Sequence, residues 1–280
     1  MSNLANDLTI YGFPEECKKF DERHPLWNEV MQNLQQAFNL AFAREQQTKG
    51  PKDRLVYCFG RLCVEDFMEI LLVCYHGYGA AASKLLRSMY ELTVTLYYLH
   101  EHPDEADIFM DYHLVQQNKL LDRLIETFGE SILPAKDVAE IRRKAAEVKN
   151  DFMVPVCDHS GAEMRLRHSW NKLDFVAMAK KAGAIGTLIV PGYFLPLRHA
   201  HPTFGGLAER QEIVDGAIGI NPDSQPDLAD RSLQTAHNCL IVALEVQKNY
   251  FKIAGLENPL QEYLRDWVRI WSPGSSLLAG

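Results

Sequence analysis

The stretch SKLLRSMYEL, residues 83–92, carries Arg87 and Glu91 inside one of the most apolar parts of the chain. Four positions separate the two side chains, so both lie on one face of a predicted helix. A guanidinium can hold an anion, and a carboxylate can take up a proton or orient the group that does. The pair is therefore a candidate polar site. The sequence also allows two structural interpretations, a solvated pair and a buried ion pair that fixes helix register.

A second polar stripe precedes this pair, because Arg61, Glu65 and Glu69 recur at intervals of four. Hydrophobic periodicity predicts helices over residues 52–76 and 80–100, and the short HGYG turn between them predicts an antiparallel hairpin. Neighbouring antiparallel helices can bring two such stripes together. We therefore expect Glu65 and Glu69 to line the wall of a polar seam opposite the first pair.

Four segments resemble, in order, an uncharacterised bacterial family of all-helical proteins, a domain of unknown function. They are GYGAAASKLLRSMYELTVTLYYL, FMDYH, HSWNKLDFVAMAKKAG and PGYFLPLRHAHPT. The family pattern is Arg-Ser-x-x-Glu, then a Trp, a Tyr, and a His that often precedes Pro or Gly. Its positions in this chain are Arg87, Ser88, Glu91, Trp170, Tyr193 and His201. The resemblance covers roughly residues 54–204. It implies a helical fold and a shared polar cluster, and it implies no known activity.

The resemblance adds Tyr193 and His201 to Arg87 and Glu91 in a candidate central cluster, with Trp170 as a supporting residue. Tyr193 and His201 lie eight positions apart, just over two helical turns, so they can share a face. A tyrosine, a histidine, a carboxylate and a guanidinium provide an acid–base pair and an anion-holding group.

Two sequence features bear on this candidate cluster. Glu69 nearby could fix the charge or tautomer of the histidine. The segment LRHAH departs from the family, because members often carry a small polar residue there, and we expect Arg198 and His199 to alter the site. The same groups could equally form a satisfied structural network.

A weaker alternative site is Arg231 with His237, within RSLQTAH. The spacing resembles the Arg-x(4–6)-His motif of the higher-eukaryote and prokaryote nucleotide-binding superfamily. Many of those helical domains are metal-independent ribonucleases of toxin and phage-defence systems. There the arginine stabilises the phosphate and the histidine assists proton transfer at the ribose hydroxyl. The competing interpretation is a surface arginine and a histidine on a helix face, since Asp230 and Ser232 also suit a helix start.

Composition limits the partners and cofactors of the chain. The formal net charge of −8 argues against duplex DNA as a partner, although it does not exclude a local basic groove. The superfamily resemblance implies RNA or a nucleotide as the partner. No glutamate has a histidine three residues later, as a di-iron bundle requires, so we expect no metal. A P-loop, a Gly-x-Ser-x-Gly elbow and a G-x-G-x-x-G fingerprint are all absent from the sequence, so no cofactor is predicted.

The helices predicted from periodicity favour an all-α fold, a single elaborated bundle of about eight helices. We expect one domain over residues 1–280, with an N-terminal extension at 1–22, a long loop at 202–226 and a frayed tail at 272–280. The N-terminus lacks the pattern of a secretory signal, and no apolar run approaches the roughly 18 residues of a membrane span. We therefore expect no membrane partner, and six cysteines without Cys-x-x-Cys spacing fit a reducing cytoplasm.

Near the C-terminus, Tyr263, Trp267 and Trp271 recur at intervals of four. We expect this aromatic stripe to dock onto the bundle, and the alternative is the interface of a homodimer.

Two functions from different classes fit these patterns. The first is a metal-independent ribonuclease or nucleotide-acting effector of a bacterial defence or toxin system. The second is a non-catalytic binding or regulatory protein whose polar cluster is buried and structural. The sequence leaves open whether the chain is an enzyme.

Overall fold

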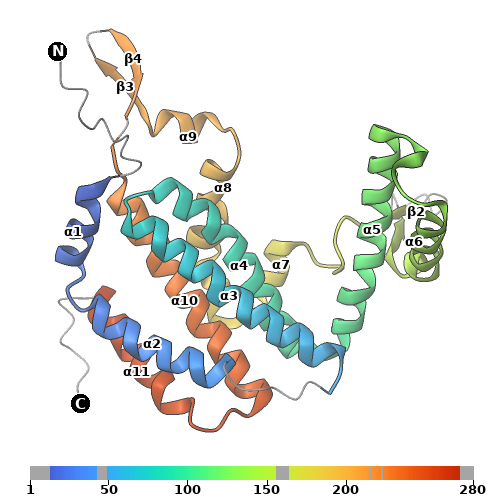
Figure 1. Cartoon of the computed structure of the whole chain (residues 1–280), viewed down its shortest axis with the longest axis horizontal. Helices are drawn as coiled ribbons and strands as arrows, with labels where there is room; N and C mark the ends of the chain where they lie inside the picture. The colour runs from blue at the N-terminus through green and yellow to red at the C-terminus, as the bar shows by residue number, and fades with distance from the viewer. Residues whose placement is uncertain (1–12, 43–48, 156–163, 215, 222, 272–280) are drawn as a thin grey trace, which may run out of the picture. The chain divides into compact units, whose positions relative to one another are not determined.

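The structure is a computed structural model that describes residues 13–42, 49–155, 164–214, 216–221 and 223–271 (Figure 1). The contacts within the chain divide it into two compact units. The first unit combines Met1–His100 with Ala179–Gly280, and the second is Glu101–Met178. This division concerns internal contacts alone, so the expectation of a single domain stays a prediction. The expected tail at 272–280 lies outside the described residues.

The fold is all-α, as predicted, and in the described residues two short hairpins are the only sheets. The helices of the first unit are α1 (Pro14–Arg23), α2 (Trp27–Phe42), α3 (Pro51–Tyr75), α4 (Gly79–Glu101), α8 (Leu195–Ala200), α9 (Phe204–Ala208), α10 (Pro226–Phe251) and α11 (Glu257–Trp271). With α5, α6 and α7 they exceed the predicted eight. The excess arises partly because α1 and α9 form where an extension and a loop were expected.

Helix α10 is the central element of the first unit, and it packs along α3. Half of its residues are buried, because apolar side chains recur on several of its faces. The two backbones approach closely at Gly60, where a Cβ atom would overlap the side chain of Gln247. The amide of Gln247 is fully buried and donates to the carbonyl oxygen of Val56 at 2.8 Å. This contact locks the α3–α10 register.

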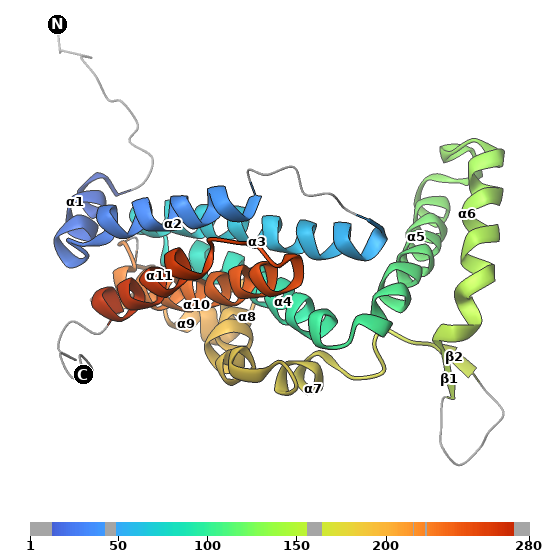
Figure 2. The ribbon, with the colours of Figure 1, turned by 90° about the horizontal axis from the view of Figure 1, so that it is seen from below.

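Helices α2 and α11 lie side by side against α10 (Figures 1 and 2). Tyr263 of α11 is fully buried, and its ring centroid lies 4.5 Å from that of His237 on α10. The indole nitrogen of Trp271 donates to Nδ1 of His237 at 3.0 Å. The aromatic stripe at the C-terminus therefore docks onto the bundle through Tyr263 and Trp271. A homodimer stays a prediction.

The chain from Gly183 to Ala200 packs against α4. In place of one regular helix, the chain forms a 3-10 segment (Gly183–Leu188), a π-helical turn η5 (Val190–Phe194) and α8 here. Pro191 and Pro196 explain the break, since proline cannot donate a helical hydrogen bond. Gly192 allows η5 to lie against α4, because a Cβ atom at this position would overlap the ring of Tyr90.

The expected long loop at 202–226 instead contains ordered elements. After α9 it forms an antiparallel hairpin of β3 (Gln211–Val214) and β4 (Ala217–Ile220). Gly216 adopts a φ of 79° in the turn, which favours glycine and suits a tight hairpin. The large apolar side chains of Ile213, Ile218 and Ile220 are exposed.

The second unit is a helical hairpin closed by a small sheet. Its elements are η1 (Pro103–Glu105), α5 (Ala106–Phe128), η2 (Glu130–Ile132), α6 (Ala135–Val148), η3 (Lys149–Phe152), β1 (Met153–Pro155), β2 (Met164–Leu166) and the start of α7 (Phe175–Lys180). The hydroxyl of Tyr112 donates to the carbonyl oxygen of Arg167 at 3.1 Å. The Arg167 guanidinium donates to the carbonyl of Asp151 and lies over the Phe152 ring. These contacts fasten the sheet to α5.

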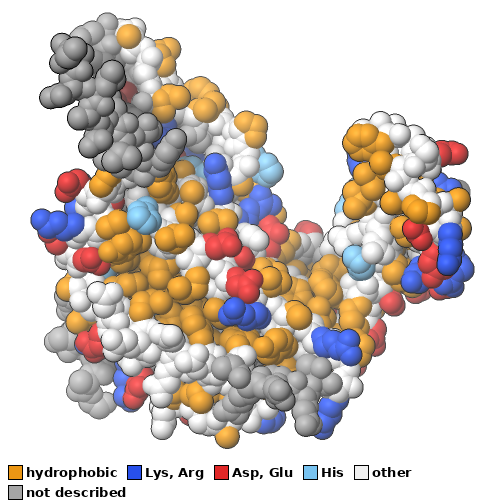
Figure 3. All heavy atoms as spheres, in the orientation of Figure 1, with side chains coloured by type: hydrophobic (Ala, Val, Ile, Leu, Met, Phe, Trp, Pro, Cys, Tyr) orange, Lys and Arg blue, Asp and Glu red, His pale blue; other side chains and the backbone are white. Residues whose placement is uncertain are grey.

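Apolar side chains gather over much of the surface drawn in Figure 3. Leu62, Met68 and Leu72 of α3 contribute to the exposed apolar surface of the first unit. Within the described residues, none of the helices has the length and apolarity that crossing a membrane requires.

Candidate functional site

Arg87 is the centre of a polar cluster in the first unit. Its Nε donates to Glu91 Oε1 at 2.9 Å, one helical turn further along α4. Its NH1 lies 3.1 Å from Nε2 of His201, the residue that follows α8. Its NH2 lies 3.5 Å from the hydroxyl of Tyr193 in η5, and the guanidinium lies 4.8 Å from the centroid of that ring. The structure thus brings all four predicted residues together across more than 100 positions of sequence. We call Arg87, Glu91, Tyr193 and His201 the Arg87 cluster.

Local sequence explains how these side chains meet. The four-residue spacing places Glu91 directly above Arg87 on α4. Gly192 lets η5 approach the Tyr90 ring, and the Tyr90 hydroxyl donates to the Ile185 carbonyl at 3.1 Å. This contact holds Tyr193 against Arg87, one turn before Tyr90 on α4. The chain then continues through α8, and His201 directly after this helix reaches the same guanidinium.

The Arg87 cluster is partly open to solvent. The side chain of Arg87 is 22% exposed and that of Glu91 is 42% exposed, while His201 belongs to the exposed residues. The sequence left open whether this seam is solvated or closed. Its arginine is sheltered and its carboxylate and imidazole are accessible, so a bound molecule can reach the acid–base groups.

The contact with Arg87 involves one ring nitrogen of His201. A guanidinium nitrogen only donates, so Nε2 of His201 is the acceptor in this contact. An unprotonated Nε2 is the form of histidine that can take up a proton from a hydroxyl. The cluster therefore places an imidazole, a phenol and a guanidinium within hydrogen-bonding distance or close to it.

Glu65 and Glu69 do not join the cluster. Glu65 pairs with Arg61 on its own helix at 3.4 Å, and both side chains are about half exposed. Among the described residues, no hydrogen bond or ion pair links Glu65 or Glu69 to the Arg87 cluster. Burial chiefly, followed by the charges of Glu69 and then Glu65, raises the pKa of Asp66 to about 6. Helix α3 turns its buried face toward α10, which leaves these carboxylates on the outer side.

Trp170 lies in the second unit rather than in the unit that holds Arg87. It is 8% exposed, and its ring stands edge-on to Phe109 at 5.2 Å between centroids. In this position it packs within its own unit.

Arg231 and His237 lie on different sides of α10. Arg231 is exposed, and its Nε donates to the carbonyl of Asp227 at 3.2 Å. His237 is fully buried, with its ring among aromatic side chains. Burial lowers the pKa of His237 to about 3, so the ring is neutral. Six positions of helix rotate the second side chain by about 240° from the first. The structure therefore does not bring this pair together.

A polar group that was not predicted as a unit lies at the end of α8. Arg198 NH2 pairs with Glu209 at 2.7 Å, and His199 Nε2 lies 3.4 Å from the same carboxylate. Burial chiefly lowers the pKa of His199, and the charges of Arg198, Lys84 and Arg210 add to this effect, while Glu209 opposes it. The sequence drew attention to Arg198 and His199, and nothing in it indicated Glu209.

In the described ranges, no group of three or more His, Cys, Asp or Glu side chains is arranged so that it could hold a metal ion.

The fold and the Arg87 cluster define an all-α protein with a half-open Arg–Glu–Tyr–His site. Residues 53–217 match the Family of unknown function (DUF5677), and this match spans more than half of the chain. The chain therefore belongs to that family, as the resemblance in the sequence implied. The match contains the complete Arg87 cluster and ends before Arg231 and His237. Comparison with curated proteins and with solved structures gives no match.

Proposed function

We propose that the chain is a metal-independent ribonuclease that acts through the Arg87 cluster. The observation that carries this proposal is the simultaneous contact of one guanidinium with Glu91, His201 and Tyr193. An anion-binding arginine beside a neutral imidazole is the combination that in-line cleavage at a ribose hydroxyl needs. The negative net charge of the chain fits a short single-stranded substrate better than a duplex.

In the proposed reaction an RNA phosphate replaces two contacts of Arg87. The acceptors on NH1 and NH2 are a neutral imidazole nitrogen and a neutral hydroxyl. A phosphate oxygen is charged and forms the stronger hydrogen bonds, so it displaces both. Glu91 keeps its bond to Nε and holds the guanidinium in place. Substrate binding thereby frees Nε2 of His201.

The freed Nε2 then accepts the proton of the ribose 2′-hydroxyl. The 2′-oxygen attacks the adjacent phosphorus, and the bond to the 5′-oxygen breaks. The products are a 2′,3′-cyclic phosphate and a 5′-hydroxyl. The leaving 5′-oxygen takes its proton from the hydroxyl of Tyr193, and the imidazolium of His201 returns a proton to the phenolate. All charges and protons balance without a metal or a cofactor.

Purified protein in excess EDTA tests this proposal with single-stranded RNA as the substrate. We expect cleavage by the wild type and a loss of about 10²–10⁴ in rate for His201→Ala and for Arg87→Ala. Arg61→Ala is the matched control, because Arg61 also pairs with a glutamate four residues later and, among the described residues, contacts no member of the Arg87 cluster. Intact RNA with the wild type, or equal rates for the wild type and His201→Ala, would contradict the proposal.

We further propose that the protein acts in the bacterial cytoplasm as an effector of a defence or toxin system. This setting rests on analogy with helical ribonucleases, which is a weaker argument than the site itself. Expression in a bacterial host should slow growth and degrade RNA with the wild type, while His201→Ala should be harmless at equal protein level. Unchanged growth and intact RNA with the wild type would rule out this setting.

A non-catalytic function is the second candidate, and a specific observation favours it. Every nitrogen of the Arg87 guanidinium already has a partner within the chain, so the cluster also fastens η5 and α8 to α4. In a binding or regulatory protein, Arg87→Ala would lower the melting temperature, and RNA would remain intact with the wild type as well. The EDTA assay described above separates the two candidates.

A further inference from the structure

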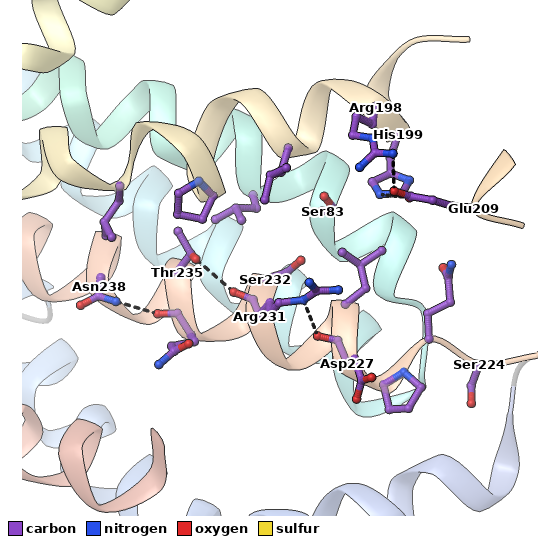
Figure 4. A pocket seen from close by; sticks show the side chains of 18 of the residues that line it. Ser83, Arg198, His199, Glu209, Ser224, Asp227, Arg231, Ser232, Thr235 and Asn238 are labelled. Carbon is purple, nitrogen blue, oxygen red and sulfur yellow. Dashed lines mark hydrogen bonds and ion pairs between the residues drawn. The ribbon is translucent and has the colours of Figure 1, made fainter. Parts of the chain in front are cut away.

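The first unit contains a cavity of about 860 Å³ that does not include the Arg87 cluster. Side chains from α4, η5, α8 and α10 form its walls (Figure 4). Figure 4 shows Arg198, His199 and Glu209 on one side, and Asp227, Arg231 and Ser232 on the other. The volume lies within the range of about 300–1,000 Å³ that is typical of small-molecule sites.

Arg231 gives this cavity a cation with unused donors. Its Nε donates to the carbonyl oxygen of Asp227, and among the described residues its two terminal nitrogens meet no acceptor. The other lining arginine differs, because Arg198 is paired with Glu209 at 2.7 Å. The Asp227 side chain is exposed and forms no ion pair with Arg231 in the part of the chain that the structure describes. Arg231 is thus the lining cation available to a ligand.

Two lining hydroxyls have no partner among the described residues. Ser83 of α4 is 2% exposed and Ser232 of α10 is 3% exposed, and both line the cavity. Neither oxygen is among the fully buried unpartnered atoms of the described chain, so both are accessible from the cavity. The indole N–H of Trp267, a third lining residue, is fully buried and has no partner in the described chain. The two hydroxyls leave hydrogen-bonding capacity that a ligand can use.

The rest of the wall is largely aliphatic. Leu86, Leu188, Pro191, Leu195 and Leu228 line the cavity. An apolar wall with a few convergent polar groups is the usual composition of a site for a small organic molecule. The wall therefore favours a ligand with an apolar body, and Arg231 favours an anionic head group.

We propose that this cavity binds a small amphipathic organic anion. The anionic group lies on the terminal nitrogens of Arg231, the hydroxyls of Ser83 and Ser232 bond to its polar substituents, and the apolar body lies against the leucines. This site is separate from the Arg87 cluster and does not depend on the proposed ribonuclease function.

Two fluorescent probes test the site on the full chain. 8-Anilinonaphthalene-1-sulfonate carries an anionic sulfonate, and N-phenyl-1-naphthylamine has nearly the same aromatic body without a charge. Arg231→Ala should weaken binding of the sulfonate about tenfold and change binding of the neutral probe less than about twofold, since only the charged head loses its partner. Leu195→Trp, at a position that is 43% exposed, should fill the cavity and weaken both probes.

Arg61→Ala serves as the control, because it removes one positive charge from the same unit outside the cavity. Thermal melting verifies that each variant is folded before binding is measured. Sulfonate binding that is equal in the wild type and Arg231→Ala would overturn the proposal. Binding of both probes that persists in Leu195→Trp would do the same, because it would place them on another apolar surface.

Discussion

The sequence suggested two Arg–His pairs, and the structure brings one pair into contact and separates the other. Arg87 and His201 are 114 positions apart and lie 3.1 Å from one another at a half-open surface. Arg231 and His237 are six positions apart, yet one side chain is exposed and the other is fully buried. Short spacing within one helix therefore does not ensure a shared site, because helical rotation can place the two side chains on different sides. Folding can bring residues together that are distant in sequence.

The two histidines also show how surroundings decide a role. His201 is exposed, and its Nε2 accepts from a guanidinium that a substrate can occupy. His237 lies among the rings of Trp27, Phe67 and Tyr263, and its contacts are those of a core residue. We infer that His201 serves chemistry and His237 serves stability.

The largest effect on stability is expected at His237. His237→Ala removes a buried ring and leaves the indole N–H of Trp271 without its acceptor. We expect a loss of about 3–5 kcal/mol in the free energy of unfolding, as for other buried rings. His201→Ala at the exposed site should change it by less than about 1 kcal/mol. Urea unfolding measures both values, and equal losses for the two variants would remove the contrast.

The stability of the protein should decrease in acid because His237 is buried. Burial lowers its pKa to about 3, whereas in the unfolded chain the ring titrates near its ordinary pKa of about 6.5. Between these values only the unfolded chain binds the proton. The stability linked to this group is complete above pH 6.5 and decreases as the pH falls toward 3, by up to about 1.4 kcal/mol per pH unit.

His237→Phe should remove this contribution, so its stability should fall less steeply than that of the wild type between pH 6.5 and 4. Urea unfolding at several pH values measures the difference. Parallel curves for the two proteins would show that His237 is not a buried neutral group.

Gly192→Ala tests how the Arg87 cluster is positioned. A Cβ atom at this residue would overlap the ring of Tyr90 and push η5 away from α4. We expect a loss of about 1–3 kcal/mol in stability, typical of overpacking, together with reduced RNA cleavage. Gly219→Ala is the control, because a Cβ atom there meets open space. Full cleavage activity in Gly192→Ala would show that the position of Tyr193 is unimportant.

The smallest effect concerns the two Arg–Glu pairs with four-residue spacing. A double-mutant cycle on Arg87 and Glu91 should give a coupling free energy of about 1 kcal/mol, because the arginine is sheltered and the contact is short. The same cycle on Arg61 and Glu65 should give about 0.3–0.5 kcal/mol, the value for an exposed helical pair. Equal couplings would mean that the cluster adds nothing to the simple pair.

The sequence predicted the bounds of α3 and α4 to within about one residue, because hydrophobic periodicity and the short HGYG turn define them. It also predicted the membership of the Arg87 cluster, through the resemblance to the family. It predicted Glu65 and Glu69 on a seam with this cluster, and in the described chain neither carboxylate bonds to a member of it. Periodicity identifies the polar face of a helix without telling which neighbour that face meets. The packing of α3 on α10 decides this, and it is a tertiary property.

The β3–β4 hairpin and the cavity beside Arg231 were not predicted from the sequence, for different reasons. The β3–β4 hairpin has a local signal in the sequence, since apolar residues flank Gly216 on both sides. The cavity beside Arg231 had none. Ser83, Leu195 and Arg231 come from three distant segments, and only the folded chain brings them around one space.

The most direct test of the reaction proposed for the Arg87 cluster is cleavage of a labelled DNA oligonucleotide that contains a single ribonucleotide, in the presence of EDTA. The proposed reaction needs one 2′-hydroxyl beside the broken bond. We predict cleavage after the ribonucleotide alone, a cyclic phosphate on the product, loss of cleavage in His201→Ala and retained cleavage in His237→Phe. Cleavage of the all-deoxy strand, or equal cleavage by the wild type and His201→Ala, would contradict the role assigned to the Arg87 cluster.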